Sequence, residues 1–347
     1  MKKSLILSAA FAIALLAPLA SALTRLDGTE PLLGKIVGQD AAKEEADAYK
    51  AWYDANAAKD YAKAIPLAKA YVEKFPSGQY TKYLKETWLP GMRAFAFNEA
   101  IKAKNMDEMI RIAKEELAQK PDNLDYIYLV ALKLRENEVF ANPPSSAHAA
   151  DTVDFTNKAI ALIEGGKTPS ANMVKDFNKG ATLSWLYQDL AIVEATNKDY
   201  DKSLDHYKKS SAADPANAVM NATNFLACGQ IHYTVKYRPA SEKFSALPKA
   251  DQDAPDSNPQ AKAILDELNK EADAVIDCWA HFMALTATNN PYGNTRSDIG
   301  KALAELYKYR HPDAPDGLQK LIDQYGTGGQ HSTAAVGSSS SASATRQ

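Results

Sequence analysis

The stretch that decides the fold covers residues 184–217 and has the sequence "SWLYQDLAIVEATNKDYDKSLDHYKKSSAADPAN". Its first half carries an aromatic residue, a leucine and an alanine, and its second half carries a small residue, an aromatic residue four positions later and a closing proline: Tyr187, Leu190, Ala191, Ser203, Tyr207 and Pro215. Small side chains let two helices approach closely, an aromatic ring fills the gap beside them, and proline stops the second helix. The stretch therefore predicts a pair of antiparallel helices joined by a short turn.

The second half of this stretch recurs elsewhere in the chain. Three further segments place two residues four apart and a proline twelve residues after the first of them: Ala64, Ala68 and Pro76; Met109, Ala113 and Pro121; and Gly300, Ala304 and Pro312. The successive closing prolines lie 45, 94 and 97 residues apart. The interval of 94 holds two units of 47, with a related but shifted copy at residues 155–169, and the last interval leaves room for one divergent unit. The recurrence predicts a repeat architecture.

These positions resemble the tetratricopeptide-repeat (TPR) family, whose pattern is W-x2-L-G-x2-Y, then A-x3-F, then P. Tyr187 stands at the tryptophan position, whereas Glu194 replaces the tyrosine and Trp52 falls where the first copy should have glycine. The resemblance covers most of residues 40–325 and implies an all-α fold, an α-solenoid of antiparallel helix pairs (TPR-like). Because the spacing exceeds the usual ~34 residues, we expect longer helices or loops, and a HEAT-like α-solenoid is the alternative.

The N-terminus has the three parts of a secretory signal peptide. Two lysines precede an apolar run at residues 5–19, and Ala20-Ser21-Ala22 forms an A-x-A cleavage site without a cysteine for lipid attachment. The apolar run is shorter than the ~20 residues that span a membrane. We expect residues 1–22 to be a cleaved signal peptide, residues 23–39 an N-terminal extension, and the mature chain to be periplasmic or secreted. A retained N-terminal anchor is the alternative.

Location in the cell envelope is also suggested by the run "AYVEKFPSGQYTKYLKE" at residues 70–86, which is similar in style to the repeats of periplasmic envelope-assembly proteins. No later stretch approaches ~20 consecutive apolar residues, so we expect no integral membrane segment after signal removal. Residues 326–347 contain no aromatic residue and almost no large aliphatic one. We expect them to form a disordered C-terminal tail, because they cannot offset their ordering entropy by burial.

A long helix is predicted at residues 260–285. Six apolar residues there are spaced three and four apart and form one stripe: Leu265, Leu268, Ala272, Val275, Trp279 and Phe282. Ser257 and Gln260 have capping-box spacing, which predicts the start of this helix. The proline-rich segments at residues 140–151 and 238–259 predict a linker and a long loop with one helical turn, respectively.

Charge and cysteine content limit the possible partners and cross-links. The net charge of −3 becomes −5 when the two lysines of residues 1–22 are removed, so nothing favours nucleic acid, which requires a basic face. Cys228 and Cys278 lie in a chain that we expect to be exported to an oxidising compartment. A disulfide is allowed there, and two small buried hydrophobic residues on separate helices are the alternative.

The sequence shows little sign of catalytic or metal chemistry. The short motifs of zinc proteases, α/β-hydrolases, P-loop NTPases and calcium loops are absent from it. We interpret Cys278 and His281 as a core pair, and the acidic residues and histidine at residues 199–206 as a solvated helix face. We therefore predict no catalytic residue, no cofactor and no metal site, and we expect the protein not to be an enzyme.

Stacked helix pairs present a groove that binds peptides or proteins, so the resemblance implies an exported scaffold that binds a protein or peptide partner in the cell envelope. The candidate partner-binding residues are two that we expect to be exposed on the first helix of the 184–217 copy and three in a polar loop at residues 286–298: Gln188, Asp189, Tyr292, Asn294 and Arg296. For the loop residues, a capping and turn loop is the alternative. The alternatives are a protein that binds a small molecule or glycan and, third, an enzyme with no recognisable motif.

Overall fold

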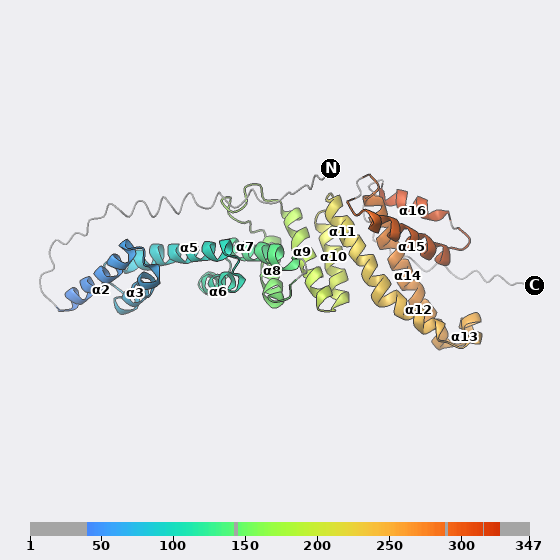
Figure 1. Cartoon of the computed structure of the whole chain (residues 1–347), viewed down its shortest axis with the longest axis horizontal. Helices are drawn as coiled ribbons and strands as arrows, with labels where there is room; N and C mark the ends of the chain where they lie inside the picture. Colours follow the sequence, from blue (N-terminus) through green and yellow to red (C-terminus); the bar gives the residue numbers. More distant parts are fainter. Residues whose placement is uncertain (1–39, 142–144, 289–290, 315, 327–347) are drawn as a thin grey trace, which may run out of the picture. The chain divides into compact units, whose positions relative to one another are not determined.

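The computed structural model describes residues 40–141, 145–288, 291–314 and 316–326, and these residues form helices and connecting loops without any β-strand. The all-α prediction is therefore confirmed for this part of the chain. The chain divides into two compact units, Met1–Phe177 and Asn178–Gln347 (Figure 1). The predicted signal peptide, the N-terminal extension and all but the first residue of the predicted tail lie outside the described residues. None of the described helices combines the length and apolarity needed to cross a membrane.

The first unit contains seven α-helices and two π-helical turns among its described residues: α2 (Asp40–Ala57), α3 (Tyr61–Lys74), α4 (Thr81–Tyr83), a π turn (Leu84–Trp88), α5 (Leu89–Lys102), α6 (Met106–Leu117), α7 (Leu124–Leu134), a second π turn (Arg135–Val139) and α8 (Ala149–Glu164). The α4 helix, the first π turn and α5 follow one another without a break. Packing joins α2 with α3, α5 with α6, and α7 with α8.

The second unit contains eight α-helices, a π turn and a short 3-10 turn among its described residues: α9 (Lys179–Thr196), α10 (Tyr200–Ala213), α11 (Ala218–Ile231), the π turn (His232–Tyr237), α12 (Arg238–Ser245), α13 (Lys249–Asp253), the 3-10 turn (Pro255–Ser257), α14 (Pro259–Leu285), α15 (Asn294–Arg310) and α16 (Gly317–Gly326). Packing joins α9 with α10, α11 with α14, and α14 with both α15 and α16. The four predicted helix-ending prolines, Pro76, Pro121, Pro215 and Pro312, lie two to four residues beyond a helix.

Three of the connections between helices contain the same kind of turn. A lysine with positive φ follows the first helix in the α2–α3, α5–α6 and α9–α10 connections: Lys59 (57°), Lys104 (53°) and Lys198 (64°). In the first of these turns Lys59 N donates to Asn56 O and Asp60 N donates to Ala55 O, which is the Schellman pattern that ends a helix. Asp60 then accepts from Lys63 N and so caps the next helix.

The α9–α10 pair confirms the predicted contact of small residues. Ser203 is fully buried, and its Oγ donates to Ala191 O at 2.7 Å. Ser210 Oγ likewise donates to Ser184 O at 2.7 Å. As the chain advances along α10 its partners recede along α9, so these two helices run in opposite directions. Small side chains with hydroxyl groups therefore hold this pair together at close range.

The long helix α14 also matches its prediction, with a different cap. Five of the six residues of the predicted stripe are buried, and Leu265 is half-buried. The cap is Asn258 rather than Ser257, because Asn258 Oδ1 accepts from Gln260 N (3.0 Å) and Ala261 N (3.4 Å). The predicted loop at residues 238–259 is mostly helical, since α12 continues α11 through the π turn and packs on α14.

A disulfide joins Cys228 of α11 to Cys278 of α14, with the two Cα atoms 6.0 Å apart. Of the two interpretations left open by the sequence, the structure supports the cross-linked one, although the cysteines do lie on separate helices. Gly229 lies beside this bond, and a Cβ atom there would lie 2.2 Å from Trp279 Cδ1. The helices therefore approach so closely here that only glycine fits.

The register predicted for the last copy is wrong by one residue. Ala304 is exposed and Gly300 is only half-buried, whereas the neighbouring Ile299 and Leu303 are buried. The buried residues of α15 belong to a core cluster with Val275 and other residues of α14. Large aliphatic residues therefore decide which face of α15 packs, and its small residues line an open side.

Candidate binding sites

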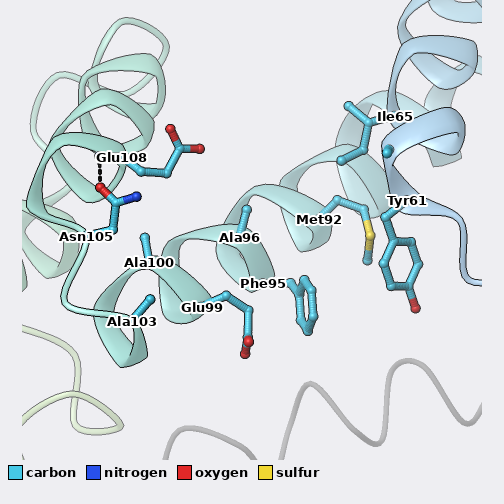
Figure 2. Close-up of a pocket in the computed structure, with 11 residues that line it drawn as sticks. Tyr61, Ile65, Met92, Phe95, Ala96, Glu99, Ala100, Ala103, Asn105 and Glu108 are labelled. Atoms are coloured by element: carbon cyan, nitrogen blue, oxygen red, sulfur yellow. Dashed lines mark hydrogen bonds between the residues drawn. The ribbon is translucent and has the colours of Figure 1, made fainter.

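A groove opens in the first unit where α5 is left uncovered between α3 and α6 (Figure 2). The α3 helix packs on the π turn at Leu84–Trp88 and on α5, and α6 packs on α5. In Figure 2, α5 crosses the view with Tyr61 and Ile65 of α3 on one side and Asn105 and Glu108 on the other. The continuous helical segment from α4 to α5 is long enough to hold its two neighbours apart.

The wall of this groove is mainly apolar, and its volume is about 420 Å³. It is lined by residues of α3, of α5 and of the start of α6: Tyr61, Ala62, Ile65, Met92, Phe95, Ala96, Glu99, Ala100, Ala103, Asn105 and Glu108. The alanines on α5 leave the space, and Phe95 presents a ring that is 36% exposed and lies 5.7 Å from the ring centre of Tyr61. A cavity of this size falls within the range of small-ligand sites, about 300–1,000 Å³.

Two carboxylates, Glu99 and Glu108, are the acidic groups of the groove wall. Lys102 Nζ donates to Glu99 Oε1 at 2.7 Å, and the Arg111 guanidinium binds both oxygens of Glu108 at 2.6 and 2.7 Å. The hydrogen bonds from Arg111 hold the pKa of Glu108 below its usual value. Asn105 Oδ1 accepts from Glu108 N and fixes the start of α6. The groove therefore combines an apolar wall with a rim that carries two carboxylates, each paired with an exposed cation.

Gln188 and Asp189 lie in the interior, so the prediction that they are exposed is wrong. Their exposed fractions are 2% and 0%. Gln188 Nε2 donates to Asn224 Oδ1 at 2.9 Å, and Asn224 Nδ2 donates to Ser210 Oγ at 2.8 Å and to Ser211 Oγ at 3.2 Å. The α9, α10 and α11 helices thus share a buried polar network. These two residues belong to that packing and not to a surface that a partner reaches.

Tyr292, Asn294 and Arg296 lie at the connection between α14 and α15. Tyr292 Oη and Thr223 Oγ1 of α11 are 2.7 Å apart, and Asn294 is exposed. Arg296 donates from Nε to Thr286 Oγ1 (3.0 Å) and from Nη2 to a backbone carbonyl at the end of α14 (3.2 Å). Arg296 therefore caps α14, in agreement with the alternative of a capping and turn loop. It also lines a cavity of about 800 Å³ formed by α14, α15 and α16.

The residues considered for metal chemistry have structural contacts. Cys278 is in the disulfide, and the His281 ring stacks between Phe225 (4.3 Å) and Tyr325 (3.5 Å). His206 Nδ1 lies 2.7 Å from Glu194 Oε2, which ties α10 to α9. Within the part of the chain that the structure describes, no group of three or more histidine, cysteine or acidic residues is arranged to hold a metal ion.

His148 makes two contacts that the sequence did not predict. Its Nδ1 lies 2.9 Å from Glu138 Oε1, and its Nε2 lies 3.1 Å from Asp107 Oδ1 of α6. Ionised carboxylates only accept hydrogen bonds, so both contacts are satisfied together only when both ring nitrogens carry a proton. Burial alone would lower the pKa of His148, but hydrogen bonds to the two carboxylates outweigh burial and raise the pKa. The imidazolium therefore joins the start of α8 to two other elements.

The residues that line the groove were also not predicted from the sequence, although the sequence contains a pattern that marks them. The segment from Met92 to Ala103 places Ala96, Ala100 and Ala103 at helical spacing next to the exposed Phe95. Alanines at this spacing commonly mark a close helix contact, and only the structure shows that Ala100 is buried while Ala96 is half-buried and Ala103 is exposed.

Compared with protein-family models, with curated proteins and with solved structures, the chain matches none. Its function is therefore inferred from the residues and contacts described above.

Proposed function

We propose that this protein is an exported scaffold, an α-solenoid of TPR-like antiparallel helix pairs, that binds a protein or peptide partner in the cell envelope. The observation that carries the proposal is the open groove on α5, which exposes apolar side chains among packed helices. Exposed apolar surface with a polar rim is typical of interaction sites. Shape alone does not fix function, so the groove is the stronger support.

The repeated turn supports the solenoid part of the proposal. Lys59, Lys104 and Lys198 are separated by 45 and 94 residues, the same intervals that separate Pro76, Pro121 and Pro215. A start signal and a stop signal that share one spacing favour a duplicated structural unit over a chance resemblance. In the first unit the main contacts join helices that are neighbours in sequence, as stacked pairs require, whereas in the second unit α11 also packs on α14 and α14 on α16.

The use of aromatic residues favours a protein partner over a glycan. In the first unit Tyr49, Trp52, Tyr71 and Trp88 pack in the core of α2, α3 and the π turn, with ring centres of Trp52 and Trp88 5.2 Å apart. A glycan site would instead need several such rings on an open face. A small-molecule ligand is the second candidate, and the size of the two cavities is the observation in its favour.

Native mass spectrometry of the mature protein, purified from its own envelope after mild cross-linking, tests the proposal. We expect a defined complex with another polypeptide. A chain that carries only a low-mass adduct would favour the small-molecule candidate. A chain that turns over a substrate, with turnover abolished by His281→Ala in a folded protein, would contradict the scaffold proposal.

A further inference from the structure

The shape of the α5 groove defines what its ligand must present. Its floor and walls come from Met92, Phe95 and two alanines of α5, from Ala103 directly after α5, and from Tyr61 and Ile65 of α3. Burial against such a surface is favourable for an apolar side chain, at about 25 cal/mol per Å². The opening toward solvent leaves the ligand's backbone outside, so the groove suits an apolar side chain presented from a larger molecule.

The charge of the rim adds a second requirement. Glu99 and Glu108 border the apolar wall, and hydrogen bonds from Arg111 lower the pKa of Glu108. Their intramolecular cations, Lys102 and Arg111, lie three residues away on the same helices and are more than half exposed. Such surface pairs contribute only about 0.3–0.5 kcal/mol, so an incoming cation can replace or join them at little cost. A basic group beside an apolar anchor therefore complements this rim.

The Asn105 amide offers a hydrogen-bond donor at the same end of the groove. Its Oδ1 is occupied by the cap of α6, and its side-chain nitrogen lies on the groove side in Figure 2. A donor at this place can bind a backbone carbonyl of a peptide, whereas an acyl chain has no acceptor for it.

We propose that the α3–α5–α6 groove binds a segment of a protein partner that carries a large apolar side chain, aromatic or branched, next to a lysine or arginine. Phe95 and Ala96 form the seat of the apolar anchor, and Glu99 and Glu108 receive the basic side chain. The inference rests on the proposed scaffold function and names the chemistry of its partner.

Fluorescence anisotropy with a labelled peptide tests this inference on the full mature chain. The probe is a leucine–lysine peptide about four helical turns long, with leucines on one face. Two matched peptides carry alanine in place of leucine, or glutamate in place of lysine. Ala96→Phe fills the groove, and Ala94→Phe is its control on the same helix, outside the lining. The double variant Glu99→Lys, Glu108→Lys reverses the rim, with Glu86→Lys as its exposed control.

We expect the leucine–lysine peptide to bind, and the two matched peptides to bind at least roughly tenfold more weakly. Ala96→Phe should weaken binding by roughly tenfold, and the charge-reversed variant should also lose the decrease of affinity with added salt. Both controls should bind as the unmodified protein does. Affinity unchanged in Ala96→Phe overturns the inference, as does equal affinity for the glutamate peptide.

A lipid could also occupy the groove, and a separate experiment tests this. Neutral phosphatidylcholine vesicles that bind as tightly as the peptide, with binding lost in Ala96→Phe, would overturn the assignment to a protein segment. A native partner that is captured equally by Ala96→Phe and by the unmodified chain would overturn this inference and leave the scaffold function standing. Circular dichroism of every variant confirms that losses of binding do not reflect unfolding.

Discussion

The α5–α6 and α9–α10 helix pairs are joined by the same kind of turn, but their small residues are used differently. Both turns place a lysine in the left-handed region, Lys104 and Lys198, before the second helix. In α9–α10 small residues close the contact, and Ser203 donates to a carbonyl of the facing helix. On α5 small residues such as Ala96 line an open groove instead. The same small side chains therefore close one helix contact and open another, depending on whether a neighbouring helix lies over them.

Of the changes considered, removing a member of the buried polar network of α9, α10 and α11 should have the largest effect on the free energy of unfolding. Asn224 connects Gln188, Ser210 and Ser211, so Asn224→Ala leaves buried polar groups without their bonds. We expect a loss of about 2–3 kcal/mol in the free energy of unfolding, measured by urea denaturation. Asn294→Ala, at an exposed position, is the control and should change it by less than about 0.5 kcal/mol. Equal effects of the two variants would mean that the network does not hold α9, α10 and α11 together.

A matched pair of small-to-large changes breaks the comparison directly. Ser203→Leu should cost about 1–3 kcal/mol, because a leucine overpacks the α9–α10 contact. Ala96→Leu should change the free energy of unfolding by less than about 0.5 kcal/mol, since its side chain enters open space. Urea titrations of both variants under the same conditions give the difference. If Ala96→Leu is as costly as Ser203→Leu, the groove closes in solution.

The difference between these regions also marks the limit of the sequence. Periodicity predicted the buried stripe of α14 and the burial of Ser203, because both depend on spacing along one helix. It placed Gln188 on the surface, since a glutamine with no visible partner is expected there. The partner, Asn224, lies 36 residues away on α11, and only the folded chain brings it near. Periodicity along one helix does not determine which other helix packs on a given face. The α5 groove therefore could not be predicted from the sequence either.

The second residue of α6 and the second residue of α10 are both aspartates, but their partners differ, so we expect their contributions to stability to depend differently on pH. Asp107 of α6 contacts His148, whereas Asp201 at the equivalent place in α10 contacts Lys236 at 2.6 Å. The raised pKa of His148 stabilises the fold fully below the unfolded value of about 6.5, and this contribution is lost as pH rises through the folded pKa. We expect His148→Gln to lose on the order of 1 kcal/mol near about pH 6 and much less near about pH 9.

Chemical denaturation of the unmodified chain and of His148→Gln at both pH values checks this expectation. Lys236→Gln is the control, because its ion pair with Asp201 contains no histidine and its loss should cost the same at each pH. A penalty for His148→Gln that does not change with pH would contradict the doubly hydrogen-bonded imidazolium.

The shared turn itself should give the smallest effect. A lysine with positive φ is strained in a way that glycine is not, although glycine loses more entropy on folding. We expect Lys104→Gly and Lys198→Gly each to raise the free energy of unfolding by about 0.5 kcal/mol. Lys208→Gly, inside α10, should instead lower it by about 1 kcal/mol. Thermal melts of the three variants show the two signs, and a loss of stability in the turn variants would contradict the left-handed assignment.

Photo-cross-linking from position 95 tests most directly whether the open α5 groove is a binding site. A photoreactive phenylalanine analogue replaces Phe95, which is 36% exposed in the groove, or Val219 as a control, which is 62% exposed on α11. Both variants are produced in the native envelope, illuminated and analysed for cross-linked polypeptides. We predict a discrete adduct from position 95 that disappears with Ala96→Phe, and none from position 219. A partner that cross-links equally from both positions, or from position 219 alone, would contradict binding in the groove.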